Sequence, residues 1–424
     1  MVGVCRPRGV ASWRGGRREG RRVAALYGRE VSTPSPSVAA TVVAPLYLAG
    51  FTTAFGAHGV AAALGVRSDD VGLTLLSFGA VLALYDVAEV LLKPLFGALS
   101  DRVGVKRLVV GGLLAFAAVS LLGAVLVTPA VLALARLGQG AAASAFSPAS
   151  SAAVARLAGP GAAGRYFGRY GAWKSLGYAV GPLLGAGLLA VGGMRALFVT
   201  LTVLAAGAAV WAAVALPPIA VLPRPRATVA DVVRQVADPT FLVPTAVLAA
   251  ATAALGVAVG FLPLVATRAG LDPVASMAAV TVLALASTVV QPVVGRLRDA
   301  GHVDTRRGAP TGLALVTAGT LLVAVAPHAV TVYAAALLVG LGIGVATPLA
   351  FAHLAASTPA ERMGRTMGAA ELGREIGDAG GPLLVGAVAV AVSLPVALGS
   401  LAVVTAGTAA VGAVALRPRP SRNP

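Results

Sequence analysis

Five acidic and four basic residues lie inside long apolar stretches of this sequence, where ionisable side chains are costly. The acids are Asp86, Glu89, Glu371, Glu375 and Asp378, and the bases are Lys93, Arg136, Lys174 and Arg374. Burial away from water favours the neutral form of a carboxyl group, so such acids can take up and release a proton. The alternative is a structural network of ion pairs that holds neighbouring helices together. The residue types alone leave both interpretations open.

Helical spacing favours Asp86 and Glu89 as the first candidates for a proton carrier. These two acids are three residues apart, and Lys93 follows Glu89 by four, so the three side chains share one helical face. Two acids there have a single base in their own helix. One of them is therefore the better candidate for a carboxyl group without a permanent partner.

A second run of charges, residues 371–378, also keeps to one side of a helix at three- and four-residue steps. Asp378, beside Gly380-Gly381-Pro382, is the next candidate for proton coupling, followed by Glu375. The remaining intramembrane groups are candidates for a substrate cavity or for ion pairs. They are Lys93, Arg136, Gln139, Lys174, Glu371 and Arg374.

The elements that carry these charges are apolar runs of a length suited to lipid. Of the 424 residues, 58% are hydrophobic and 12% charged, whereas soluble domains have roughly 25% charged residues. A helix rising 1.5 Å per residue needs about 20 residues to cross the hydrocarbon core. The sequence predicts an all-α membrane protein with twelve such helices, at 39–63, 72–97, 107–127, 130–154, 166–191, 195–216, 241–266, 274–297, 311–327, 329–355, 365–392 and 395–416.

Basic residues are distributed unequally between alternate loops. If the N-terminus is cytoplasmic, the inside segments hold 26 Lys and Arg and the outside loops hold 3. The positive-inside rule therefore predicts that both termini are cytoplasmic. Residues 217–240 form the longest internal connection. The predicted parts are an Arg-rich disordered tail (1–37), a six-helix bundle (38–216), a linker (217–240), a second bundle (241–416) and a cytoplasmic tail (417–424).

Several other function classes lack support in the sequence. The net charge of +17 is concentrated in loops and in the first 29 residues, not on a basic face interleaved with aromatics, so nucleic acid is not an expected partner. The single Cys5 excludes an internal disulfide and a thiolate metal cage. No His-Glu-x-x-His or Gly-x-Ser-x-Gly pattern occurs. We expect no enzyme activity, cofactor or metal.

The two halves repeat each other at an offset of 200 residues. Gly181-Pro182-Leu183-Leu184 recurs as Gly381-Pro382-Leu383-Leu384, and basic positions share the same register. A six-helix unit repeated in one orientation predicts two bundles related by an axis along the membrane normal. Substrate then binds near the midplane between them, and rocking of the halves exposes the site to each side in turn.

Three motifs resemble those of the major facilitator superfamily. The stretch Gly97-Ala-Leu-Ser-Asp101-Arg102-Val-Gly104-Val-Lys106-Arg107 is similar to the cytoplasmic signature of that family. Arg136-Leu-Gly-Gln139-Gly140 resembles its Arg-x-x-Gln-Gly element, and Gly177-Tyr-Ala-Val-Gly181-Pro182-Leu-Leu-Gly185 resembles a pattern of its drug:proton antiporter branch. The resemblance covers residues 38–416 and implies the major facilitator fold.

The first motif suits a conformational lock formed by Gly97, Asp101, Arg102, Gly104, Lys106 and Arg107. We expect Asp101 to interact with the N-terminal end of the helix that follows it and with a nearby arginine. The alternative is that this loop only anchors the topology. The second-half counterpart, Asp299-Ala300-Gly301, lacks the arginine after the acid, so a lock is less well supported there.

The Gly-Pro motif, comprising Gly177, Gly181, Pro182 and Gly185, is expected to kink its helix, since proline removes a backbone donor. The resemblance implies that it shapes the sealed state of an antiporter. A purely structural kink is the alternative.

The leading hypothesis is proton-coupled efflux of a small amphipathic compound by a monomer in a bacterial inner membrane, a location favoured by the Arg-rich composition. Its partners would be the solute, protons and the lipid bilayer. The first alternative is a symporter or facilitator for uptake of a nutrient or organic anion, with Arg136, Lys174 and Arg374 as substrate contacts. The second is a membrane receptor or assembly subunit that does not transport.

Overall fold

The computed structural model describes residues 36–67, 75–159, 161–222, 234 and 237–416. The chain divides into two units, Met1–Thr41 and Val42–Pro424, and every contact discussed below lies within the second. Residues 1–35 of the predicted N-terminal tail and all of the predicted tail 417–424 lie outside the described residues. Positions 36 and 37, predicted as tail, already belong to the first helix.

The described residues form eleven long helices and one short 3₁₀ turn. They are α2 (Pro36–Arg67), α3 (Leu75–Val103), α4 (Val105–Val125), α5 (Pro129–Ala158), α6 (Ala163–Ala215), α8 (Pro239–Arg268), α9 (Pro273–Asp299), α10 (Thr305–Val325), α11 (Ala329–Ser357), η2 (Ala360–Arg362), α12 (Met363–Ala391) and α13 (Leu394–Ala415). Several begin with proline in the first turn and an acceptor side chain before it. Asp272, for example, accepts from the backbone N–H groups of Val274 and Ala275.

The predicted runs coincide with these helices, and the difference in number arises at α6. This helix of 53 residues contains both predicted runs 166–191 and 195–216. Its backbone leaves helical geometry at Gly192 (φ −151°) and Gly193 (φ 65°). A positive φ costs glycine little, so the chain turns between two helical arms without an intervening loop. The sequence predicted two helices where the structure has one broken helix.

Seven of the described helices are long and apolar enough to cross a bilayer: α4, α6, α8, α9, α10, α11 and α13. Helices α3 and α12, which carry most of the intramembrane charges, fall outside this group. The described parts of α3 and α12 are thus less uniformly apolar than those seven helices.

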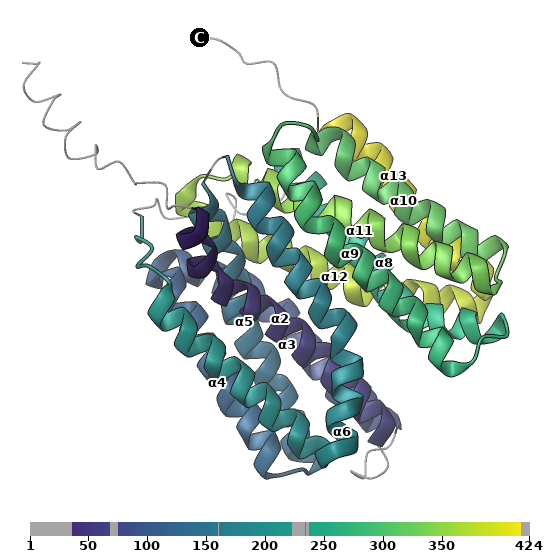
Figure 1. Cartoon of the computed structure of the whole chain (residues 1–424), viewed down its shortest axis with the longest axis horizontal. Helices are drawn as coiled ribbons and strands as arrows, with labels where there is room; N and C mark the ends of the chain where they lie inside the picture. The colour runs from purple at the N-terminus through teal and green to yellow at the C-terminus, as the bar shows by residue number, and fades with distance from the viewer. Residues whose placement is uncertain (1–35, 68–74, 160, 223–233, 235–236, 417–424) are drawn as a thin grey trace, which may run out of the picture. The chain divides into compact units, whose positions relative to one another are not determined.

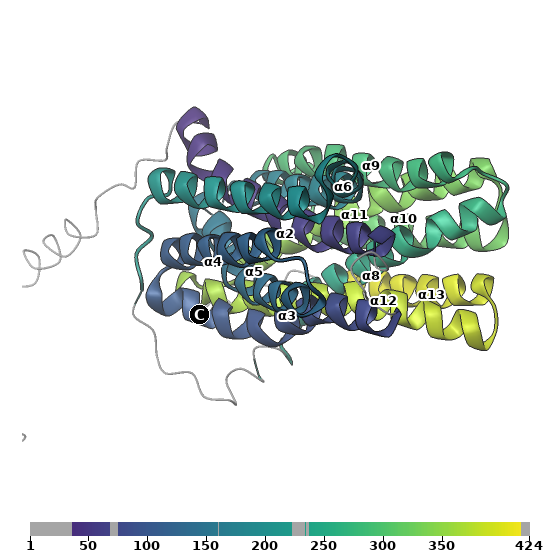
Figure 2. The same ribbon diagram turned by 90° about the horizontal axis from the view of Figure 1, so that it is seen from below.

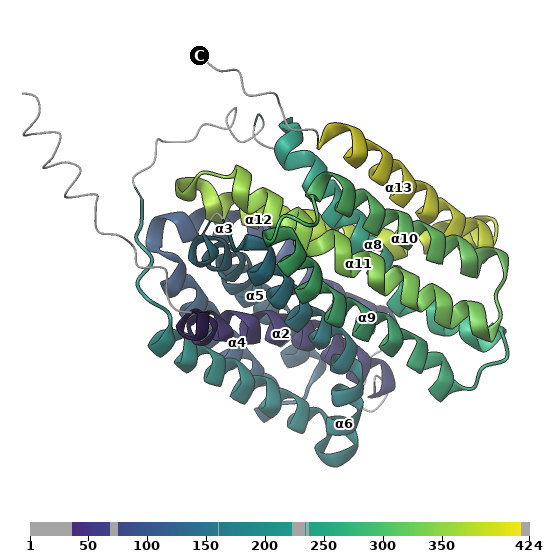
Figure 3. The same ribbon diagram turned by 45° about the horizontal axis from the view of Figure 1, so that its top comes forward.

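The helices gather into two bundles, α2–α6 (purple to teal) and α8–α13 (green to yellow), as Figure 1 shows. Contacts between the bundles are made chiefly by two helix pairs, α6 with α9 and α3 with α12, supplemented by α11 with α6 and α12 with α5. Figures 2 and 3 show α3 beside α12 from two directions. The intramembrane charges of α3, α6 and α12 are therefore brought to the contact between the bundles.

Candidate functional site between the two bundles

At one end of the bundles, the helix pairs α3–α12 and α6–α9 pack backbone against backbone. A Cβ atom added at Gly97 of α3 would lie 2.7 Å from Cα of Gly368 on α12. One added at Gly295 of α9 would meet the backbone of Gly164 on α6. Glycine permits these approaches because it has no side chain to separate the helices.

Asp101 joins the two bundles at this end. Its carboxylate accepts hydrogen bonds from the backbone N–H groups of Gly364 (2.8 Å) and Arg365 (2.9 Å), in the first turn of α12. Arg156 of α5 also donates to it at 3.1 Å. The sequence predicted that Asp101 meets the helix directly after it and a nearby arginine. The arginine is Arg156, and the helix start that Asp101 caps is that of α12, in the other bundle.

Asp299 makes the corresponding contact in the opposite sense. Its two carboxylate oxygens accept from the backbone N–H groups of Gly164 (2.8 Å) and Arg165 (2.7 Å), at the start of α6. The missing arginine after Asp299 does not prevent this, because the bonds use only the carboxylate and backbone amides. We call the end defined by Asp101, Asp299 and their amide partners the interlocked end.

The other residues of the Asp101 motif face outward or support the turn. Arg102 and Arg107 are exposed, and Lys106 donates to the carbonyl oxygen of Leu216 at 2.6 Å. Gly104 has φ 96° at the junction between α3 and α4, where a residue with a side chain would be strained.

About three helical turns away from the interlocked end, the facing sides of α3 and α12 are exposed. Asp86 precedes Gly97 by eleven residues and Ala379 follows Gly368 by eleven, which keeps each on the same helical face as its glycine. Both are exposed. The interface is thus closed at the interlocked end and uncovered toward the other.

Glu371 of α12 is the centre of a buried charge cluster between the bundles. Its Oε2 accepts from Nζ of Lys174 on α6 at 2.9 Å and from Arg374, one turn along α12, at 3.2 Å. Its Oε1 accepts from the hydroxyl of Ser151 on α5 at 2.9 Å. The Glu371 side chain is fully buried. A buried carboxylate with three donors is stably satisfied.

Lys93 of α3 lies in a second cluster and pairs with two acids. Its Nζ is 3.1 Å from Oε1 of Glu89 in the same helix and 2.5 Å from Oε1 of Glu375 on α12. The Lys93 side chain is 0% exposed, that of Glu89 4%, and that of Glu375 12%. Glu375 is therefore the most accessible carboxylate of the two clusters. The predicted pair Glu89–Lys93 is present, and sequence spacing could not have revealed the partner from α12.

Asp86 and Asp378 stand apart from both clusters. Within the described part of the chain neither makes an ion pair, and Asp378 packs against Gly256 of α8. The sequence predicted that one of Asp86 and Glu89 lacks a permanent basic partner. Glu89 pairs with Lys93, and Glu375 takes the second position on Lys93.

Arg136 and Gln139 lie on α5 inside the first bundle. The Arg136 guanidinium donates to the carbonyl oxygen of Gly56 at 3.1 Å and lies 4.3 Å from the centre of the Tyr85 ring. Gln139 donates to the hydroxyl of Ser120 at 2.9 Å. Both side chains are buried and bind protein groups, so neither faces the contact between the bundles in this state.

A narrow cavity lies beside the Glu371 cluster. It is lined by aromatic and polar groups of both bundles, including Tyr170, Lys174, Tyr178, Gln291, Phe351 and Arg374. Its volume is about 20 Å³, enough for one water molecule. Gln291 donates to the hydroxyls of Ser175 (2.7 Å) and Ser287 (3.0 Å). The bundles are thus in contact at this level.

The Gly-Pro motif of α6 packs against α2. A Cβ atom at Gly177 would lie 2.8 Å from the carbonyl oxygen of Phe51, and one at Gly185 would lie 2.6 Å from that of Gly59. Gly377 and Gly381 of α12 meet α8 in the same manner. These glycines serve close helix packing within each bundle.

Sequence reasoning missed two polar contributors to the site. Arg156 had been counted only as a loop charge, and Ser151 had no signal in an Ala/Ser-rich stretch. The repeat held one clue to the two aspartate contacts. Gly164-Arg165 recurs as Gly364-Arg365 at an offset of 200, and Asp101 recurs as Asp299 at an offset of 198.

The chain has the features expected of two copies of one unit: equivalent glycine contacts and equivalent aspartate contacts between the two bundles. A family model described as Major Facilitator Superfamily matches residues 46–303 and, separately, residues 245–424. The chain belongs to the Major Facilitator Superfamily. It is accordingly a multi-pass membrane protein of a transporter family.

Two curated relatives match this chain over part of its length. The puromycin resistance protein pur8 of Streptomyces alboniger is 40% identical over 121 residues, 28% of this chain and 24% of that protein. A multidrug resistance protein B homolog of Mycobacterium tuberculosis is 36% identical over 133 residues, 31% of this chain and 25% of that protein. The chain spans about a quarter of the length of the curated relatives it matches.

Among solved structures, the human organic anion transporter MFSD10 (TETRAN) superimposes with a TM-score of 0.70. The match covers 89% of this chain and all of that one, at 18% sequence identity. This likeness establishes the Major Facilitator fold.

Proposed function

We propose that this transporter exports a small amphipathic compound in exchange for protons, by alternating access to a site between its bundles. The observation that carries the proposal is the position of Lys93. It holds one carboxylate from its own bundle and one, Glu375, from the other, beside an interface that is closed at one end only. A proton arriving at this cluster can change a contact between the bundles, which is what coupling requires.

The proposed topology has twelve crossings, with the two arms of α6 counted separately on either side of Gly192 and Gly193. Both termini are cytoplasmic, as favoured by the loop charges. The interlocked end then faces the cytoplasm, and the hydrogen bonds of Asp101 and Asp299 between the bundles keep it closed. The described state would be one that is shut toward the cytoplasm.

The proton step follows from the exposure of the acids. In the proposed cycle, a proton from the uncovered side reaches Glu375 and neutralises it. The attraction between Glu375 and Lys93 is then lost, while Glu89 retains Lys93 within α3. The link between α3 and α12 is weakened, and the interlocked end can open. Asp86 and Asp378, at the uncovered level or near it, would deliver protons to this cluster.

The solute is proposed from the composition of the cavity and from the relatives. Tyr170, Tyr178 and Phe351 offer aromatic faces, while Lys174, Arg374 and Glu371 supply charges of both signs. Widened when the bundles part, such a site would suit a molecule with an apolar ring system and a polar group. The resistance proteins of Streptomyces and Mycobacterium make an antibiotic such as puromycin the first compound to test.

The uptake alternative requires basic groups that are free to bind an anion. In this state Lys174 and Arg374 both bind Glu371, and Arg136 binds Gly56 and the Tyr85 ring. Their engagement with the protein favours the exporter, in which the clusters respond to protons.

The test is transport into everted vesicles containing this protein, with labelled puromycin and an imposed pH gradient. We expect the vesicles to accumulate labelled puromycin, to lose it when a protonophore is added, and to dissipate the pH gradient faster when the drug is present. Glu375→Gln should abolish gradient-driven accumulation while retaining drug exchange. Asp304→Asn, which changes an exposed acid outside the site, is the control. Accumulation by Glu375→Gln at the wild-type level would refute the coupling assignment.

A further inference from the structure

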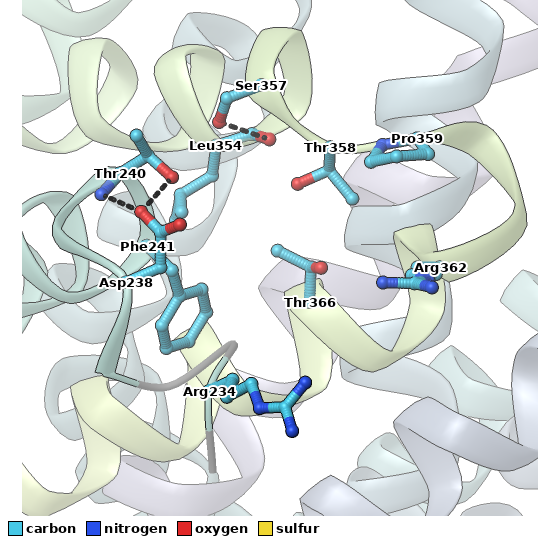
Figure 4. A pocket seen from close by; sticks show the side chains of 10 residues that line it. All are labelled: Arg234, Asp238, Thr240, Phe241, Leu354, Ser357, Thr358, Pro359, Arg362 and Thr366. Atoms are coloured by element: carbon cyan, nitrogen blue, oxygen red, sulfur yellow. Dashed lines mark hydrogen bonds between the residues drawn. The ribbon is translucent and has the colours of Figure 1, made fainter. Parts of the chain in front are cut away.

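A separate pocket lies within the second bundle, at the interlocked end. It is bounded by the start of α8, the end of α11, η2 and the first turns of α12, and its volume is about 300 Å³. Figure 4 shows the side chains of Thr358, Thr366 and Arg362 on one side of the open space and those of Asp238, Thr240 and Phe241 on the other, with Arg234 below them. We name it the two-arginine pocket, after Arg234 and Arg362.

The charges in this pocket favour an anion. Both arginines are exposed, and within the described part of the chain neither guanidinium is paired with a carboxylate. Asp238 supplies an opposing charge, but its Oδ1 accepts from the backbone N–H (2.8 Å) and the hydroxyl (2.7 Å) of Thr240 and so caps α8. Two positive groups thus border a pocket whose single acid is occupied by a helix end.

The groups around the arginines point to a phosphate. A guanidinium presents paired N–H donors that match phosphate oxygens. Thr358 adds a hydroxyl on the same side of the pocket as Arg362, as Figure 4 shows. Phe241 and Leu354, both nearly buried, form an apolar floor that can pack against the organic part of the same ligand. We propose that the two-arginine pocket binds a phosphate group carried by a small metabolite or by a lipid headgroup.

The position of the pocket gives its occupancy a consequence. Arg362 ends η2, and Gly364, two residues later, donates its N–H to Asp101. Arg156 of the first bundle donates to the carbonyl oxygen of Ala360 in the same turn at 2.6 Å. A ligand that holds Arg362 against α8 and α11 fixes the segment that the first bundle grips. Binding would therefore stabilise the interlocked end.

The experiment compares two sources of phosphate with the full-length protein. Melting temperature is measured in detergent against increasing inorganic phosphate and glycerol 3-phosphate, with chloride replacing them at constant ionic strength. In parallel, bound phosphatidylglycerol per protein is quantified after reconstitution with mixed lipids. The variants are Arg234→Gln, Arg362→Gln and, as a matched control, Arg307→Gln, an exposed arginine of α10 outside the pocket.

A saturable rise in melting temperature with the soluble phosphates, weakened about tenfold or more in apparent Kd by Arg234→Gln or Arg362→Gln, would identify a soluble ligand. Loss of bound phosphatidylglycerol in the same two variants would identify a lipid headgroup. In both cases Arg307→Gln should behave as wild type. If no phosphate source binds, or if Arg307→Gln weakens binding equally, the proposal is wrong and only general surface charge is at work. None of these outcomes depends on the direction of transport.

Discussion

Asp299 accepts a 2.8 Å hydrogen bond from the backbone N–H of Gly164, and Asp101 accepts an equivalent 2.8 Å bond from Gly364, with the donor and acceptor bundles exchanged. Each aspartate lies in the last turn of a helix of one bundle and caps the first turn of a helix in the other. The two contacts together close one end of the molecule, and each uses a carboxylate and backbone amides.

We therefore predict that Asp299→Asn and Asp101→Asn weaken the interlocked end to a similar degree. Each substitution removes the charge that stabilises a helix N-terminus and replaces one of the two acceptor oxygens with an NH₂ group, at a cost of about 1–3 kcal/mol. Spin labels on Arg107→Cys and Arg307→Cys, exposed positions in different bundles, report the separation at this end. Both variants should shift the distance distribution toward longer values.

The comparison has a clear opposite outcome. If Asp101→Asn lengthens the distance and Asp299→Asn leaves it unchanged, the additional bond from Arg156 to Asp101 matters more than the shared geometry. Asp304→Asn, with the same labels, controls for the loss of a nearby negative charge.

The helices could be predicted from sequence because lipid imposes both their length and their composition. The ends of the predicted runs lie within six residues of the helix ends, and two predicted runs share one helix only at the junction Gly192–Gly193 of the described residues. That junction has no polar residue, so hydropathy could not distinguish a break from a connection.

The site was less predictable because its partners are far apart in sequence. Glu89 and Lys93 could be paired by helical spacing, whereas Lys93 and Glu375 are separated by 282 positions. The role of Asp299 was undervalued for a different reason. A sequence motif shows side chains only, whereas the partners of Asp299 are backbone amides.

Removal of Lys93 should destabilise the protein more than removal of either acid. Lys93→Gln leaves Glu89 and Glu375 as unpaired buried carboxylates, at a cost of about 3–5 kcal/mol. Glu375→Gln leaves Lys93 with Glu89 and should cost less. Thermal unfolding in detergent measures both, and the double variant Lys93→Gln with Glu375→Gln should recover part of the loss. If the two losses simply add, the groups are not coupled.

The Glu371 cluster allows a graded comparison. Glu371→Gln leaves Lys174 and Arg374 as buried cations without their carboxylate, so we predict a loss of several kcal/mol in unfolding free energy. Ser151→Ala removes one hydrogen bond to the same carboxylate and should cost about 1 kcal/mol. Denaturant unfolding in mixed micelles would rank the two. Equal losses would mean that the cations find other partners.

Substitution of Gly97 should open the interlocked end without changing any charge. A Cβ there would lie 2.7 Å from Cα of Gly368 and 2.8 Å from the carbonyl oxygen of Gly364, both backbone atoms that cannot turn aside. Gly97→Ala must therefore separate α3 from α12. The labels on residues 107 and 307 should report a longer distance, and proton-driven transport should fall. Gly380→Ala is the matched control, because no neighbouring atom lies within 4 Å of its Cβ position on α12. An unchanged distance in Gly97→Ala would show that this contact does not set the closure.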